Sequence, residues 1–360
     1  MTDADGDGVR RGLVLGAGGV LGLTWMIAAL TALEAEEGFD ARTVEVCIGT
    51  SAGSVLASLL GCGVGVDVAL RHQQGIPAPA DPDISWDYDR DSGGAAPPRP
   101  GFGIGSPRLL LEAARHPRRV PPMAAFSAAL PRGRGTLRPL HRMVELVSEP
   151  LSGGWPVAPS TWIVAMDYGA GTRTVFGRDG SPPAALADAV TASCAIPGWY
   201  APVLIGNRPY VDGGTLSPTS LDLLVGDGLD EVYVLAPMAS FAYDRPRAAM
   251  ARAERRWRRL VTRRVLADAE ALRASGTAVT VLGPGPEDLQ AIGANLMDPR
   301  RRQAVLTTAL RTSTQALRRR DGDRGWSLRT GTVSWCGCTF RRPRGRCRSW
   351  STRASWGRRR

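Results

Sequence analysis

A serine flanked by small residues stands between a predicted strand and a predicted helix. The run Thr43 to Ile48 is rich in β-branched and apolar residues, and it ends at Gly49-Thr50-Ser51-Ala52-Gly53. This sequence fits G-x-S-x-G, in which a sharp strand-to-helix turn presents the serine hydroxyl at the carboxyl end of a sheet. The small neighbours allow the turn, and the positive end of the following helix lies beneath the hydroxyl. We therefore predict that Ser51 is a nucleophile, with Gly49 and Gly53 shaping its turn.

A glycine-rich loop follows the first predicted strand, Arg11 to Leu15. It reads Gly16-Ala17-Gly18-Gly19-Val20-Leu21-Gly22 and leads into a predicted helix over residues 23–36. Such a loop can bind a dinucleotide, or it can hold backbone N–H groups around a developing oxyanion. Because the next predicted strand ends in the serine turn, both turns lie at the same edge of a parallel sheet. This placement favours the oxyanion hole.

A serine nucleophile needs a group that accepts its proton. The chain has only three histidines, none after residue 141: His72, His116 and His141. In the usual triad a histidine follows the acid along the chain. All three histidines precede Asp212, so none can complete that order with Asp212 as the acid. Asp212 ends a short predicted strand and precedes Gly213 and Gly214, a combination that by itself is more typical of an ordinary turn. What remains is a Ser51–Asp212 dyad, in which the carboxylate takes the proton directly.

Taken together, these motifs resemble the patatin-like phospholipases. The similarity runs from Leu13 to Gly214, and it includes Ala192-Ser-Cys-Ala-Ile-Pro-Gly before Tyr210-Val-Asp-Gly-Gly. The resemblance implies an α/β, three-layer patatin-like fold with a mostly parallel central sheet flanked by helices. It also implies a serine esterase that hydrolyses carboxylic esters of phospholipids or other lipids through an acyl-enzyme, without metal or cofactor.

The resemblance assigns roles to particular residues. Ser51 would be the nucleophile and Asp212 the general base. The N–H groups of Gly18 and Gly19, aided by that of Ala52, would form the oxyanion hole. The remaining motif positions are supporting glycines: Gly16, Gly22, Gly49, Gly53, Gly213 and Gly214.

Two positions depart from the family pattern. Ala17 stands where the family typically has glycine, so it fits the loop only with a negative φ. Leu21 stands where a basic residue is common, and this change removes a charge that could hold an anionic head group. The hydrolytic chemistry survives both changes because the oxyanion hole uses backbone atoms, but the preference among phospholipids, neutral lipids and simple esters stays open.

The rest of the chain predicts one domain. We expect residues 1–9 to be a disordered N-terminus, 10–317 one acyl hydrolase domain, and 318–360 a basic, disordered tail. Residues 75–105 are expected as a mobile insertion, either a cover over an acyl pocket or a plain surface loop. Further strands are predicted at 161–167, 172–177, 203–205, 208–212, 230–237 and 278–285, and helices at 107–114, 123–130, 136–147, 183–193, 246–275 and 300–317.

Charge and composition restrict the partners. The net charge of +11 arises in the tail, where 14 arginines face two acids, so the rest of the chain is nearly neutral and nucleic acid is not expected as a partner. The expected partner is a lipid or ester, with peripheral membrane contact as a further expectation. No signal peptide and no apolar run of membrane-spanning length is recognised, so we expect a cytoplasmic protein, peripheral at most at the inner face of the membrane.

Three alternatives remain open. The Arg-rich helix at 246–275 could lie on a membrane, although a solvated face is the simpler interpretation. The chain could be a catalytically silent lipid-binding protein, which would associate with lipid without forming an acyl-enzyme. A dinucleotide-binding oxidoreductase is the third alternative, and it would leave Ser51 unreactive towards a fluorophosphonate.

Overall fold

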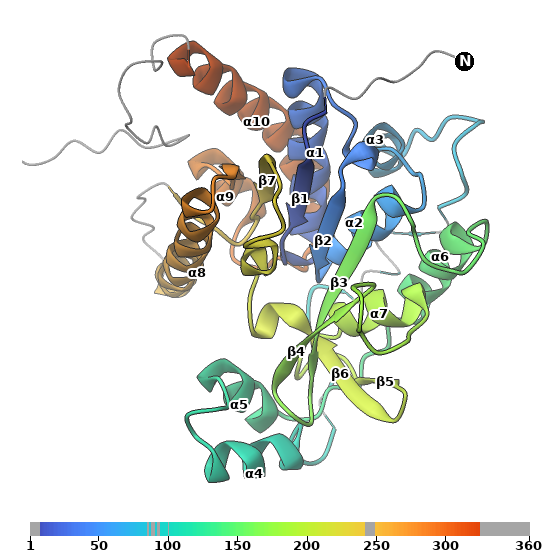
Figure 1. Ribbon diagram of the computed structural model, residues 1–360. Helices are drawn as coiled ribbons and strands as arrows, with labels where there is room; N and C mark the ends of the chain where they lie inside the picture. The colour runs from blue at the N-terminus through green and yellow to red at the C-terminus, as the bar shows by residue number, and fades with distance from the viewer. Residues whose placement is uncertain are drawn as a thin grey trace, which may run out of the picture.

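The structure is a computed structural model, and it describes residues 8–84, 86–87, 91, 94–99, 101–241 and 249–324. It contains an eight-stranded sheet (Figure 1). The strands are β1 (Arg11–Leu15), β2 (Val46–Thr50), β3 (Ser160–Asp167), β4 (Thr172–Phe176), β5 (Val203–Ile205), β6 (Arg208–Asp212), β7 (Glu231–Leu235) and β8 (Ala278–Leu282). The α-helices are α1 (Gly19–Glu37), α2 (Ala52–Gly61), α3 (Val66–Gln74), α4 (Pro107–Arg115), α5 (Pro122–Ala129), α6 (Arg138–Ser148), α7 (Leu186–Ser193), α8 (Ala249–Ala274), α9 (Pro286–Ile292) and α10 (Arg302–Arg324).

The sheet is mostly parallel, as predicted. Its order is β5-β6-β3-β2-β1-β7-β8, with β4 paired to β3 outside this path. Five neighbouring strands are parallel to one another: β3, β2, β1, β7 and β8. Strands β4 and β6 each pair antiparallel with β3, and β5 pairs antiparallel with β6. The central strands β1 and β2 are buried on both faces, which explains why their sequences are continuous apolar runs rather than alternating ones.

Helices cover both faces of the sheet and give the three layers expected for the fold class. One face packs against α1, α2, α7 and α10, whose buried side chains join those of Leu13 and Leu15 in the larger core. The opposite face presents Val14, Ile48 and Val164 to α8 and to the short helix η3 (Leu221–Leu224). A third cluster joins α4 and α5 to β3 and β6, at the lower end of the view in Figure 1. The predicted fold class is confirmed.

Helix α1 starts at Gly19, four residues earlier than predicted, and it is apolar on nearly all sides. By length and hydropathy it could cross a membrane, which differs from our expectation that no segment would. Its side chains from Leu21 to Leu33 are mostly buried inside the domain, and it packs along α10. A helix buried on all sides has the same composition as a membrane span, and α1 is the core helix of this domain.

Other boundaries differ from the sequence expectations. Helices α3 and α9 were not predicted, although Pro286 at the start of α9 and Asp288 in its first turn are ordinary helix-start signals. Helix α10 continues to Arg324, so it extends seven residues into the segment expected as a disordered tail. Residues 1–7 and 325–360, which carry most of the two predicted disordered ends, lie outside the described residues. In the insertion, residues 76–84 and 86–87 are described as irregular backbone.

Candidate active site

Ser51 sits at the sharp turn between β2 and α2. Its backbone has φ 54° and ψ −122°, a left-handed conformation that is strained for a residue with a Cβ. Close backbone approach enforces the turn: a Cβ on Gly53 would lie 2.0 Å from the Leu15 carbonyl oxygen, and one on Gly49 would lie 2.5 Å from the Ser54 Cα. The two glycines of the motif are therefore required by packing.

A network of side chains holds the backbone of Ser51. Its N–H donates to the Ser193 hydroxyl at 2.9 Å, and this hydroxyl donates to the Val164 carbonyl at 2.6 Å. The Ser51 carbonyl accepts from the Ser54 hydroxyl at 2.6 Å and from the Cys194 thiol at 3.3 Å. Ser193 and Cys194 belong to the Ala192–Gly198 run, so that run positions the nucleophile. Nothing in the sequence pattern indicates this role for Ser193.

The register of the sheet brings Asp212 to Ser51. On one edge of β3, Val164 lies opposite Thr50, the last residue of β2, and the next residue, Ala165, lies opposite Asp212, the last residue of β6. The residue that follows Thr50 is thus placed beside Asp212. The Ser51 hydroxyl lies close enough to the Asp212 carboxylate to lower the pKa of that carboxyl. The two residues predicted as a dyad are brought together.

The Asp212 carboxylate is buried, with 6% of the residue exposed. Its Oδ1 accepts the Gly214 N–H at 2.7 Å, and its own N–H donates to the Ala195 carbonyl at 3.0 Å. Burial raises the pKa of Asp212 from 3.8 to about 6, although the Ser51 hydroxyl and the bond from Gly214 oppose the rise. A carboxylate with this pKa is a stronger base than a solvent-exposed one and is still ionised at neutral pH.

The glycine loop lies against the same site. The N–H groups of Gly16 and Ala17 donate to the carbonyls of Leu235 and Pro218 at 2.9 and 2.7 Å, which fixes the loop to the ends of the neighbouring segments. Ala17 does not have a positive φ. This agrees with the expectation that an alanine fits the loop only with a negative φ. Gly19 has φ +61° and begins α1.

The predicted oxyanion-hole donors lie at two helix starts. Gly18 and Gly19 stand at the beginning of α1 and Ala52 at the beginning of α2, where backbone N–H groups have no partner within the helix. Within the described part of the chain, no backbone acceptor is bound to these three N–H groups. Ala17, Gly18, Gly19 and Ser51 share the wall of one groove. The donors are therefore placed where they could face an oxygen bound at Ser51.

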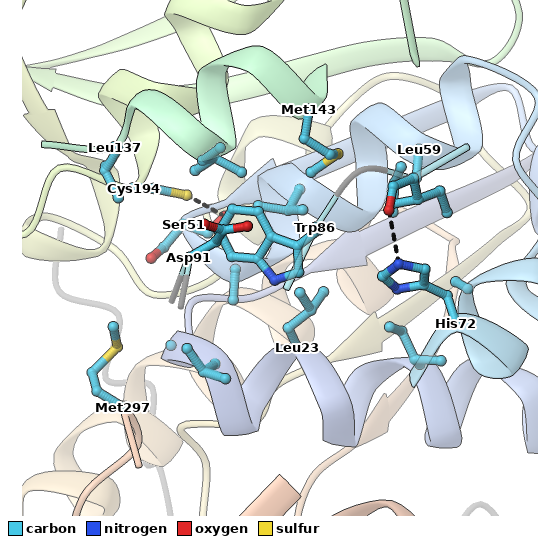
Figure 2. Close-up of a pocket in the computed structure, with 18 of the residues that line it drawn as sticks. Leu23, Ser51, Leu59, His72, Trp86, Asp91, Leu137, Met143, Cys194 and Met297 are labelled. Carbon is cyan, nitrogen blue, oxygen red and sulfur yellow. Dashed lines mark hydrogen bonds between the residues drawn. The ribbon is translucent and has the colours of Figure 1, made fainter. Parts of the chain in front are cut away.

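Two hollows meet at Ser51. The more enclosed of the two, an apolar cavity of about 90 Å³ called here the enclosed cavity, extends on one side, and a more open groove of about 400 Å³ lies on the other. Ser51, Gly19, Ile196 and Met297 line both. Figure 2 shows the enclosed cavity, with Ser51 and Cys194 towards one end and His72 towards the other. An ester whose carbonyl lies at Ser51 can thus extend in two directions.

The histidines take no place beside the nucleophile. His72 Nε2 pairs with the Ile84 carbonyl at 2.8 Å, His141 Nε2 with Asp188 at 3.0 Å, and His116 lies exposed near Glu112. His72 lies in the last turn of α3 and lines the enclosed cavity. No metal-binding cluster of His, Cys, Asp or Glu is found among the described residues.

Comparison with known families agrees with this geometry. The family model for patatin-like phospholipase matches residues 13–225, a span that contains the glycine loop, the serine turn and Asp212. The chain belongs to the patatin-like phospholipase family. The resemblance stated from the motifs is confirmed. No curated protein matches the chain.

Two solved structures are similar to this chain at low identity. The type III effector protein ExoU is 17% identical with a TM-score of 0.35, and the match covers 87% of this chain and 53% of that one. VipD from Legionella pneumophila is 14% identical with a TM-score of 0.39, and the match covers 86% of this chain and 67% of that one. The chain therefore spans about half the length of ExoU. At these TM-scores neither likeness bears on substrate.

Proposed function

We propose that the protein is a serine esterase that hydrolyses carboxylic esters of lipids through an acyl-enzyme on Ser51. The observation that carries the proposal is the placement of a strained, buried serine beside a buried carboxylate of raised pKa, Asp212. A nucleophile beside its base is the arrangement that activates a hydroxyl. The patatin-like phospholipase family supports the lipid as substrate class.

The proposed reaction has two halves. Asp212 takes the Ser51 proton while Oγ attacks the ester carbonyl, and the N–H groups of Gly18, Gly19 and Ala52 stabilise the oxyanion. The intermediate collapses, the C–O bond to the alcohol breaks, and Asp212 returns the proton to the leaving alcohol. Water then gives its proton to Asp212 and attacks the acyl-enzyme. The fatty acid leaves and Ser51 recovers its proton from Asp212.

The two hollows divide the substrate. The walls of the enclosed cavity are mostly apolar and contain Leu23, Val55 and Leu59, although Asp91 and His72 also line it, so this cavity suits the acyl chain. The open groove contains Phe126, Trp199 and Trp257 and gives the alcohol part a way to solvent. This division favours an ester with one apolar acyl arm and tolerates different alcohols.

The rim of the groove fits peripheral membrane contact. Helices α5 and α8 both reach the groove and expose large apolar side chains there: Met123, Phe126, Trp257 and, one turn further, Leu260. Arg256 and Arg263 are exposed on the same helix as Leu260. Exposed apolar residues bordered by arginines bind anionic bilayer surfaces. We therefore propose a cytoplasmic enzyme that docks this rim on the inner face of a membrane, while the buried face of the Arg-rich helix packs on the core.

A fluorophosphonate reaction followed by intact-mass measurement tests the proposal. We expect one adduct on the wild-type chain and none on Ser51→Ala, together with hydrolysis of a short-chain reporter ester by the wild type alone. Absence of an adduct on folded wild-type protein would instead favour the catalytically silent lipid-binding protein. Tight binding of a dinucleotide with an unreactive Ser51 would favour the oxidoreductase. The position of the glycine loop beside Ser51 argues against that last alternative.

A further inference from the structure

The segment after α3 is tied back onto that helix. Arg71 Nε donates to Asp81 at 2.9 Å, and the Asp81 Oδ2 also accepts the Ala78 N–H at 2.7 Å. The guanidinium lowers the pKa of Asp81 to about 2, so this pair stays ionised at neutral pH. The next residue of α3, His72, pairs through Nε2 with the Ile84 carbonyl at 2.8 Å. Asp81 and Ile84 are thus both bound to α3, so the segment after this helix is held at two points along its length.

This clamp delivers Trp86 to the enclosed cavity. Ile84 is 8% exposed and lies in the cavity wall, and its carbonyl also accepts the Trp86 N–H at 2.7 Å. In Figure 2 the indole of Trp86 lies across the middle of the cavity, between Ser51 and His72. The indole therefore borders the path of a chain that runs from Ser51 towards His72.

The apolar lining along the helices around the cavity is longer than the free space in the cavity. Val55 and Leu59 lie one turn apart on α2, and Leu23 and Ile27 lie one turn apart on α1. This spacing extends the apolar lining by about 6 Å along each helix. The free volume is nevertheless only about 90 Å³, well below the roughly 300–1,000 Å³ of sites that enclose a drug-sized ligand. The Trp86 indole is one of the side chains that bound this volume.

We infer that Trp86 sets the acyl chain length, because its indole closes the cavity part-way and restricts the enzyme to short acyl chains. The inference rests on the proposed function. In the wild type, added methylenes meet the indole, so they cannot gain the burial that normally favours a longer chain in an apolar pocket. Without the indole, the chain can continue along Leu59 and Ile27 towards His72.

The test is a chain-length profile of kcat/KM with p-nitrophenyl esters from butanoyl to hexadecanoyl. We expect the wild type to prefer butanoyl or hexanoyl over dodecanoyl. Trp86→Ala should raise the dodecanoyl-to-butanoyl ratio by at least about 10-fold, since each additional buried methylene can contribute that much. Trp86→Phe should lie between the two. Trp86 is only half-buried, so both variants should fold, and circular dichroism checks this.

Two variants separate the position of the indole from a general disturbance. Asp81→Asn breaks the clamp on α3 and should shift the profile in the same direction by a smaller factor. Ile76→Ala lies in the same segment, but Ile76 is 62% exposed and is not part of the cavity wall, so its profile should match the wild type. An unchanged profile in active Trp86→Ala, or a wild type that already prefers dodecanoyl, would overturn the inference.

A second readout keeps the inference separate from the proposed function. If the wild type hydrolyses none of the esters, the proposed function fails, and calorimetry with butanoate and dodecanoate then tests Trp86 alone. Dodecanoate binding that increases about 10-fold or more in Trp86→Ala would support the inference for a silent lipid-binding protein. Equal dodecanoate binding by both chains would overturn it.

Discussion

The amide of Ser51 is bound to the hydroxyl of Ser193 at 2.9 Å, and Ser193 is fully buried. The same hydroxyl donates to Val164 on β3, so one side chain joins the serine turn, α7 and the central sheet. A conformation as strained as that of Ser51 persists only where its surroundings hold it. Ser193 is one of the groups that do so.

Ser193→Ala should therefore damage both stability and activity. The substitution leaves a buried N–H and a buried carbonyl without their partner, which costs about 1–3 kcal/mol, and kcat should fall more than KM rises. Urea denaturation and ester kinetics measure the two effects. The control is Ser58→Ala, because Ser58 is also buried but bonds only to Val55 in its own helix. Equal behaviour of the two variants would argue against a positioning role.

The backbone strain at Ser51 can be measured with two inactive variants. Ser51→Ala keeps a Cβ at φ 54°, whereas Ser51→Gly removes it. Both should lose ester hydrolysis by roughly 10⁴-fold or more. Ser51→Gly should nevertheless be more stable than Ser51→Ala by about 1 kcal/mol, since glycine adopts a positive φ without strain. Denaturant midpoints decide this, and Ser51→Ala proving the more stable of the two would contradict it.

Activity should depend on the ionisation of Asp212. Its pKa is raised to about 6 by burial, and only the carboxylate can take the Ser51 proton. The kcat/KM for a neutral ester should therefore increase with pH, reach half its plateau near pH 6 and level off above about pH 7. A stopped-time assay between pH 4.5 and 8 measures the profile. A midpoint near 4 would show that burial does not perturb the catalytic carboxyl.

The same pKa shift affects stability with a defined sign. Because the folded protein holds the Asp212 proton more tightly than the unfolded chain, this group stabilises the fold most below about pH 4, and the contribution is lost as the pH increases through about 6. Asp212→Asn has no such charge to bury. It should be inactive yet more stable than the wild type at pH 7, by up to about 3 kcal/mol, with the difference shrinking towards pH 4. Thermal unfolding across this pH range tests the sign.

The glycine loop gives a matched pair of substitutions. A Cβ on Gly18 would lie 2.6 Å from Pro237 Cγ and 2.8 Å from the Gly22 Cα, so Gly18→Ala must displace the loop. We expect kcat to fall by roughly 10²–10³-fold, the effect of losing an oxyanion-hole donor. Ala17→Gly should change kcat little, because the Ala17 N–H is already bonded to Pro218. Reporter-ester kinetics with both variants distinguish the two positions.

Membrane docking predicts a loss of binding without a loss of chemistry. The double variant Arg256→Ala/Arg263→Ala should weaken association with phosphatidylglycerol vesicles by about 2 kcal/mol, or roughly 30-fold, at about 1 kcal/mol for each arginine near an anionic surface. Hydrolysis of a soluble butanoyl ester should be unchanged. Arg264→Ala is the control on the same helix, since Arg264 is paired with Asp268. Equal co-sedimentation of the wild type, the double variant and Arg264→Ala with these vesicles would place the membrane contact elsewhere.

The sequence by itself determined the fold class and predicted the chemistry-bearing positions. Turn residues act locally, since the tight turn at Ser51 requires glycine at positions 49 and 53. The continuous apolar runs of β1 and β2 follow from the burial of both faces of these strands. The motifs therefore predicted the family, which is confirmed, and the dyad, which stays a prediction until activity is measured. Prediction from the sequence missed short helices such as α3, whose stability comes from packing rather than from a strong local pattern.

Only the tertiary structure decided which distant residues surround the nucleophile. Asp212 reaches Ser51 because Val164 and Ala165 on β3 pair with β2 and β6 in one register, and sheet register between distant strands is not encoded in either strand alone. Ser193, Trp86 and His72 gave no signal in the sequence for the same reason. A lone serine, tryptophan or histidine acquires a role only from the cavity or the carbonyl that the fold places beside it.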